Sequence, residues 1–317
     1  MKKSGEPPQA IMKKSKLQTR SYKALLEDFT NWLDILGFSA TMQKNYPAQL
    51  CEFLYWLEQN GHTEITTISK EYVKSYYRHL QERPNKTRGG GLSKAYLNAH
   101  QSSLKKFREY LKKHHHKPFE MHIKREKKTD QSINYCTPSE IKALFTATNY
   151  SHELPRFRAR NKALLVCLYS LGMRRNEVIN LQLNDILWDK ERVFVRKGKN
   201  YKERFVPINR YNLEILEDYV FDGRMDFNKA SESEYVFVTQ RSQKISSFAL
   251  GNDLQRIVKA THNTTLQTKN ITPHSLRHSI ATHFLQAGMP IEDIRQFLGH
   301  SSLESTQIYT HVLKYEK

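Results

Sequence analysis

Apolar side chains recur at helical spacing through most of the first 113 residues, and this pattern constrains the fold more than any other feature. Four segments carry it: 21–38, 39–60, a third that starts near Ser69, and 93–113. Pro47 lies inside the second segment and is expected to kink or split that helix. Four helices with short joints predict a compact all-α domain of roughly 100 residues.

The second half of the chain predicts a mostly helical domain with a small antiparallel sheet. Thr137-Pro138-Ser139-Glu140 has the cap residue, proline and glutamate of a strong helix start. Further helices are predicted over 158–171, from Arg174, and over 209–221, 246–261, 273–287, 290–298 and 301–312. Segments 192–196 and 204–208 predict two strands joined by a hairpin turn, and 235–239 predicts another short strand.

The charge balance indicates a polyanionic partner. Lys and Arg number 51 against 32 Asp and Glu, a formal charge of +19. Nucleic acid is the first candidate and an acidic membrane surface the second. Residues 1–17, with five lysines and one glutamate, form a predicted flexible basic tail that serves either solubility or phosphate contact. Residues 105–128 hold ten Lys and Arg against three Glu, which predicts a basic linker.

Several classes of protein are excluded by what the sequence lacks. The longest nearly apolar run, 163–171, is far shorter than the ~18–20 residues that span a bilayer, and no signal peptide is expected. Three widely spaced cysteines do not make a disulfide scaffold or a four-cysteine zinc site, so a reducing compartment is expected. No nucleotide-binding P-loop or metalloprotease motif occurs, and neither ATP nor a metal cofactor is predicted.

Two short motifs place cations at predicted helix starts. Arg174 lies just after the break at Gly172, at a helix start where free N–H groups and the helix dipole favour an anion. Glu177, three residues on, is spaced to hold Arg174 or a neighbour. Taken alone, this segment is more simply interpreted as a solvated cap. His274 and Arg277 are three residues apart and share a helix face, as phosphate binding by an imidazole and a guanidinium requires.

The histidines also allow a metal-binding interpretation. His274, His278 and His283 could be taken as a zinc set, but neither a fourth ligand nor a glutamate at metalloprotease spacing accompanies them. The consecutive histidines at 114–116 do not share a helix face. No metal site is therefore predicted.

The last motif lies near the end of the chain. Gly299-His300 closes one predicted helix, and Ser301 with Glu304 forms a capping box for the next. Tyr309 follows His300 by nine residues. Because the chain has 17 tyrosines, Tyr309 by itself suggests packing rather than chemistry.

Taken together and in order, these motifs resemble the tyrosine recombinase/phage integrase family. The matching positions are Arg174, Glu177, Lys199 in the hairpin turn, His274, Arg277, His300 and Tyr309, and residues 272–311 look especially like Xer-type recombinases. The resemblance spans about residues 20–312. It implies a mainly α fold: an N-terminal four-helix core-binding (SAM-like) domain over 18–117, a basic linker over 118–136, and a mainly α catalytic domain with a small antiparallel β-sheet over 137–317.

The same resemblance implies the chemistry. Tyr309 would be the nucleophile that forms a 3′-phosphotyrosine on DNA, and Lys199 would protonate the leaving 5′-oxygen. Arg174, Arg277, His274 and His300 would surround the non-bridging oxygens, His274 could also take the tyrosine proton, and Glu177 would support them. Tyr315 and Lys202 are nearby competitors for the first two roles, but their spacing matches the family less well.

The expected function is site-specific recombination by an enzyme that needs neither ATP nor metal. Its expected partner is double-stranded DNA, clamped between the two domains and bound by a homo-tetramer or hetero-tetramer on two sites. The expected location is the cytoplasm, at the nucleoid, with no membrane. A type IB topoisomerase-like activity, a catalytically silent DNA-binding regulator and a membrane-surface protein are the alternatives.

Overall fold

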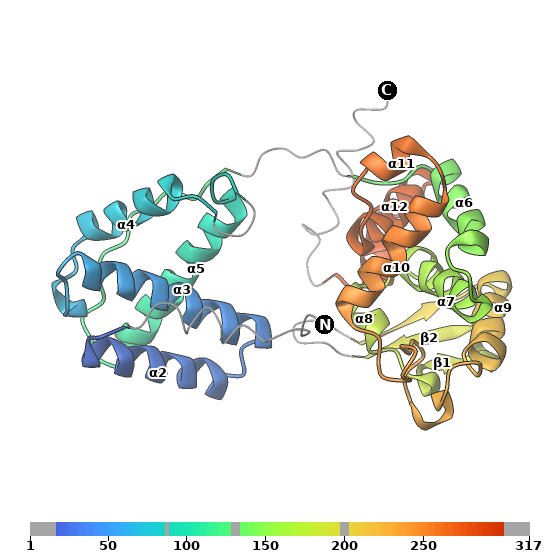
Figure 1. Cartoon of the computed structure of the whole chain (residues 1–317), viewed down its shortest axis with the longest axis horizontal. Helices are drawn as coiled ribbons and strands as arrows, with labels where there is room; N and C mark the ends of the chain where they lie inside the picture. The colour runs from blue at the N-terminus through green and yellow to red at the C-terminus, as the bar shows by residue number, and fades with distance from the viewer. Residues whose placement is uncertain (1–16, 86–88, 128–133, 197–202, 301–317) are drawn as a thin grey trace. The chain divides into compact units, whose positions relative to one another are not determined.

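The computed structural model describes residues 17–85, 89–127, 134–196 and 203–300 (Figure 1). The chain divides into two compact units, Met1–Asp130 and Gln131–Lys317, and each unit is considered by itself. The division falls within the segment 118–136, for which the sequence predicts a linker. The predicted domain boundaries themselves stay a prediction.

The first unit contains the helices that the periodicity predicts. They are α2 (Arg20–Ile35), α3 (Ala40–Gln59), α4 (Lys70–Glu82) and α5 (Lys94–Lys113). Ser39, Ser69 and Ser93 cap α3, α4 and α5, because each serine hydroxyl accepts a backbone N–H of the first turn. α3 runs unbroken through Pro47, so the predicted split does not occur. Pro47 is buried with the helix face that follows it, and this packing offsets one missing backbone hydrogen bond.

Aromatic side chains fill the core of the first unit. The rings of Phe29 and Phe107 meet edge to face with centroids 5.3 Å apart. Phe119 packs on Phe107 at 6.3 Å, and Met121 is buried in the same core. These two residues belong to the predicted linker, so its first part packs on this unit.

The second unit is mainly helical. Its helices are α6 (Pro138–Ala147), α7 (Pro155–Leu165), α8 (Arg175–Ile179), α9 (Arg210–Glu217), α10 (Ser247–Ala260), α11 (Thr264–Thr268), α12 (Pro273–Gln286) and α13 (Ile291–Leu298), and π-helical turns extend α7 over Val166–Ser170 and α9 over Asp218–Gly223. The short α11 is not among the predicted helices, and the helix predicted over 301–312 lies outside the described residues. Within the described ranges, no helix has the length and apolar character that a bilayer crossing requires.

A three-stranded antiparallel sheet accompanies these helices, in the order β1 (Ile186–Leu187), β2 (Arg192–Val195), β3 (Arg204–Pro207). Val193 pairs with Val206 and Val195 pairs with Arg204. The two strands predicted on either side of the hairpin turn are thus confirmed, and the mainly α fold with a small sheet is confirmed with them. Residues alternate between buried and exposed along β3, so Arg204 and Val206 face the interior together.

The predicted strand over 235–239 is wrong. The segment makes only isolated bridges, from Tyr235 to Gln182 and from Val238 to Lys244, within the described residues. Val236, Phe237 and Val238 are nevertheless almost fully buried. Their strand-like composition reflects this burial rather than pairing in a sheet.

A buried ion pair crosses the core of the second unit. Arg160 of α7 donates from Nη2 to Oδ2 of Asp253 on α10 at 2.6 Å, and from Nη1 to the carbonyl of Val238 at 2.7 Å. The two charged side chains are only 4% and 3% exposed. Because burial raises the pKa of Asp253 more than Arg160 lowers it, this carboxylate depends on its arginine.

We expect Arg160→Met to lower the free energy of unfolding by about 3 kcal/mol at pH 7, since it leaves the Asp253 charge buried and unpaired. Arg256→Met is the matched control, because Arg256 also contacts Asp253, at 3.3 Å, but is 54% exposed. Its loss should stay below about 1 kcal/mol. Urea unfolding followed by circular dichroism measures both, and equal losses would contradict this account of the pair.

Candidate active site

The start of α8 brings Arg174 and Glu177 together. Arg174 is the N-cap residue of α8, and its backbone N–H donates to Oε2 of Glu177 at 2.8 Å. Its guanidinium donates from Nη1 to Oε1 of the same carboxylate at 2.9 Å. Gly172, two residues earlier, has a φ of +55°, and a Cβ there would lie 2.8 Å from a methyl carbon of Leu298. The glycine therefore permits both the turn into α8 and its close approach to α13.

The start of α12 supplies the second predicted arginine. Thr272 caps this helix by accepting the backbone N–H of Ser275, and Pro273 occupies the first helical position. Arg277 is 4% exposed. Its Nη1 donates to the carbonyl of Gly172, and its Nη2 donates to the carbonyl of Leu298 at 2.6 Å.

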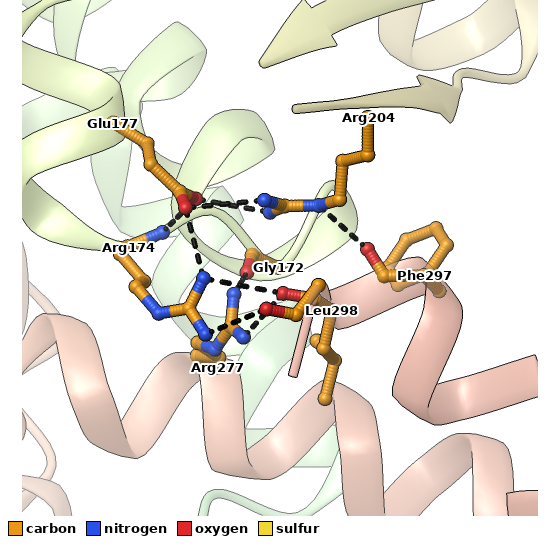
Figure 2. Close-up of polar contacts among 8 residues, drawn as sticks. Gly172, Arg174, Glu177, Arg204, Arg277, Phe297 and Leu298 are labelled. Carbon is orange, nitrogen blue, oxygen red and sulfur yellow. Dashed lines mark hydrogen bonds and ion pairs between the residues drawn. The ribbon is translucent and has the colours of Figure 1, made fainter. Parts of the chain in front are cut away.

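The C-terminal end of α13 joins the two arginines (Figure 2). The Leu298 carbonyl that accepts from Arg277 also accepts from Nη1 of Arg174 at 3.4 Å, and the Gly299 carbonyl accepts from Nη2 of Arg174 at 3.1 Å. Gly299 adopts a left-handed φ of +64°, which ends α13 and turns the chain into His300. Arg174, Arg277 and the backbone before His300 thus converge on one turn of the chain.

A third arginine at this turn was missed by the sequence analysis. Arg204, the first residue of β3, donates from Nη1 and Nη2 to the two oxygens of Glu177 at 3.1 and 2.9 Å. Its Nε donates to the carbonyl of Phe297 at 2.9 Å, as Figure 2 shows. The sequence could have indicated Arg204 through the alternation of β3. In that pattern Arg204 shares a face with Val206, and a cation on a buried face is unusual.

The electrostatics of the cluster favour an anion. Glu177 pairs with Arg174 and Arg204, while Arg277 donates to backbone carbonyls. One carboxylate against three guanidinium groups leaves these four side chains with an excess of positive charge. Burial by itself would raise the pKa of Glu177, but the hydrogen bonds and charge of Arg204, and then those of Arg174, lower it to about 2. The carboxylate therefore stays ionised, and the remaining cationic charge can stabilise an oxyanion such as a phosphate.

The neighbouring histidines are neutral at pH 7 in the unliganded protein. Burial and then the charge of Arg277 lower the pKa of His274. Burial, followed by the charges of Arg277 and Arg174, lowers the pKa of His300 to about 3. Burial and the proximity of His274 lower the pKa of His278 to about 4. A neutral imidazole can donate its one N–H to a bound anion, while its other nitrogen can accept a proton.

Two of the predicted site residues are not described by the structure. Lys199 and Tyr309, with their competitors Lys202 and Tyr315, lie outside the described residues. His283, which the zinc interpretation would need, shares a hydrogen bond of 2.9 Å with the hydroxyl of Tyr169. Among the residues that the structure describes, no three His, Cys, Asp or Glu side chains are grouped to hold a metal ion.

We expect Gly299→Ala to destabilise the protein by about 3 kcal/mol, because it adds a steric conflict to the cost of a left-handed alanine. A Cβ at Gly299 would lie 2.9 Å from both Cδ and Nη1 of Arg204. Gly288→Ala is the control, since Gly288 has a φ of +84° with nothing within 4 Å of its Cβ position. That variant should lose only about 1 kcal/mol in urea unfolding. Similar losses in the two proteins would show that contact with Arg204 does not matter.

The chain resembles known proteins along most of its length. Residues 134–316 match the model described as the phage integrase family. The chain is 30% identical over 297 residues to tyrosine recombinase XerC of Bacillus pumilus, covering 92% of each chain. It is 33% identical over 273 residues to tyrosine recombinase XerC of Lacticaseibacillus casei, covering 84% of this chain and 86% of that protein.

Solved structures share the fold. The XerH site-specific recombinase bound to a palindromic difH substrate superimposes with a TM-score of 0.70 at 20% identity, covering 93% of this chain and 82% of that one. A lambda integrase dimer bound to a COC′ core site gives a TM-score of 0.64 at 15% identity, with 90% and 94% covered. The family model covers more than half of the sequence, and the XerC relatives extend the match over both units. The chain therefore belongs to the phage integrase family, among its Xer-like tyrosine recombinases.

Proposed function

We propose that this protein is a site-specific DNA recombinase, which cleaves and rejoins duplex DNA through a 3′-phosphotyrosine intermediate. The observation that carries the proposal is the convergence of Arg174 and Arg277 on the Leu298 carbonyl, two residues before His300. The names of the XerC relatives support the reaction class, and the XerH and lambda integrase structures, which are bound to DNA, support the substrate class.

The proposed phosphate site works by electrostatic stabilisation. Arg174 and Arg277 supply fixed positive charge for the non-bridging oxygens of the scissile phosphate, on which negative charge gathers in the transition state. His274 and His300 complete the group of side chains proposed to surround this phosphate. Burial and the nearby arginines lower the pKa of both imidazoles, and a neutral His274 is able to take the tyrosine proton.

In the proposed reaction Tyr309 provides the phenol oxygen that bonds to phosphorus, and its proton passes to a base. The bond from phosphorus to the 5′-oxygen breaks, and Lys199 gives that oxygen a proton. One phosphodiester bond is exchanged for another, so the reverse attack by a 5′-hydroxyl rejoins DNA with no energy from ATP. Both residues are assigned from the family resemblance.

The proposed partner is double-stranded DNA, bound as a tetramer on two sites and composed of one or two kinds of subunit. The formal charge of +19 supports binding to a polyanion, and binding should weaken steeply as salt rises. A nucleoid location follows from the same proposal. A silent regulator and a type IB topoisomerase-like enzyme are not favoured, because the relatives over both units are named recombinases.

We expect Tyr309→Phe to abolish the covalent protein–DNA adduct while leaving duplex binding within about threefold, because only the nucleophilic oxygen is lost. The assay is denaturing gel electrophoresis after incubation with nicked suicide duplexes that carry candidate recombination sites. Tyr315→Phe is the matched control and should form adducts at the wild-type level. Adducts that persist in Tyr309→Phe would remove Tyr309 from the nucleophile role.

We expect Lys199→Ala to slow strand cleavage by about 10²–10⁴-fold, as the loss of a general acid does. A substrate with sulfur in place of the scissile 5′-oxygen should restore the rate, since a thiolate leaves without prior protonation. Lys202→Ala should cleave both substrates like the wild type. A Lys199→Ala rate that the sulfur substrate leaves unchanged would rule out the general-acid assignment.

A further inference from the structure

We propose that Arg204 is a positioning residue for the recombination reaction, and that it holds Glu177 and the end of α13 so that Arg174 keeps both its place and its positive charge for the scissile phosphate. The inference rests on the proposed function, because it concerns how that phosphate site is held together. It adds to the site a residue from the sheet, which no sequence motif used above includes.

The first support is the geometry of the carboxylate. Glu177 is 10% exposed, and its two oxygens accept from both ends of the Arg204 guanidinium, at 3.1 and 2.9 Å. The same oxygens accept the backbone N–H and Nη1 of Arg174. Such a two-pronged pair fixes the plane of a carboxylate as well as its position. Arg204 therefore sets the orientation of the group that orients Arg174.

The second support is the balance of charge. A buried glutamate beside a lone Arg174 would neutralise most of the charge that a phosphate needs, because ion pairs are strong where water is excluded. Arg204 supplies the compensating cation: its hydrogen bonds and charge lower the pKa of Glu177 more than those of Arg174 do. Glu177 can thus orient Arg174 without cancelling its charge.

The third support is the contact with α13. Nε of Arg204 donates to the carbonyl of Phe297 at 2.9 Å, and its side chain lies directly against Gly299, where a Cβ would come within 2.9 Å. The carbonyls of Leu298 and Gly299, which follow Phe297, accept from Arg174. One arginine thus holds the Glu177 half and the α13 half of the site at a fixed separation (Figure 2).

The contacts of Arg204 distinguish it from a catalytic residue. Each of its three side-chain nitrogens donates to Glu177 or to Phe297, and the side chain is 8% exposed. Arg174 is more accessible, at 15%, and its Nη2 donates to a backbone carbonyl rather than to a carboxylate. We therefore infer that Arg204 positions Arg174 and does not itself contact the substrate.

The experiment compares single-turnover adduct formation, duplex affinity and urea unfolding among four proteins: wild type, Arg204→Met, Glu177→Gln and the double variant. Arg204→Met should cleave about 100-fold more slowly than wild type with duplex affinity within about threefold, because a misplaced cationic group costs this much in rate. Arg192→Met is the matched control, an exposed arginine on the neighbouring strand of the same sheet, and should cleave at the wild-type rate.

The double variant separates positioning from plain stabilisation. At a temperature where every variant is folded, adding Glu177→Gln to Arg204→Met should raise the cleavage rate about tenfold or more, because a neutral amide no longer neutralises Arg174. A residue needed only for folding would give no such gain. If Arg204→Met does not fold, Arg204→Lys replaces it. Lysine keeps the charge but lacks the two parallel N–H donors of a guanidinium. The Arg204→Lys protein should cleave at an intermediate rate, and adding Glu177→Gln should raise that rate.

The proposal is overturned if the Arg204 variants cleave within about threefold of wild type, or if Glu177→Gln slows Arg204→Met further. Failure of the proposed function looks different, since the wild-type protein would then form no adduct on any duplex. In that case, urea unfolding of the same four proteins would still test whether Arg204 and Glu177 are coupled. Additive losses of stability for Arg204→Met and Glu177→Gln would show that the two side chains are not coupled.

Discussion

The last turn of α13 is the feature on which the candidate site depends. A helix end leaves backbone carbonyls without partners and carries the negative end of the helix dipole, so it suits cations. Here the carbonyls of residues 297–299 accept from Arg174, Arg204 and Arg277. These arginines come from a helix cap, a strand and a second helix. Three separate elements are therefore held to one turn of backbone.

Such a cluster would repel itself without a counter-charge. Glu177 provides it, and the hydrogen bonds and charges of Arg204 and Arg174 stabilise its ionised form and lower its pKa. Because one carboxylate serves two arginines directly and Arg277 is paired with carbonyls, an excess of cationic charge remains at the site. This excess is only a small part of the chain's formal charge of +19.

Much of the fold could be predicted because its helices have strong local signals. Serine caps, apolar periodicity and the Thr137 capping box place the helix starts within a residue or two, and the hairpin strands follow from their β-rich composition. The errors have a common origin in tertiary packing. Burial of Pro47 with its neighbours keeps α3 continuous, and burial of residues 236–238 imitates a strand where no ladder forms.

The sequence by itself determined which residues occupy helix starts and ends, since capping and glycine turns act within a few positions of the chain. With the family resemblance it also named one candidate site: Arg174, Glu177, Lys199, His274, Arg277, His300 and Tyr309. Only the tertiary structure decided that a strand arginine, distant in sequence from Glu177 and from α13, shares that carboxylate and that turn. Pairing of this kind depends on how a sheet packs beside two helices, and no local pattern of residues records it.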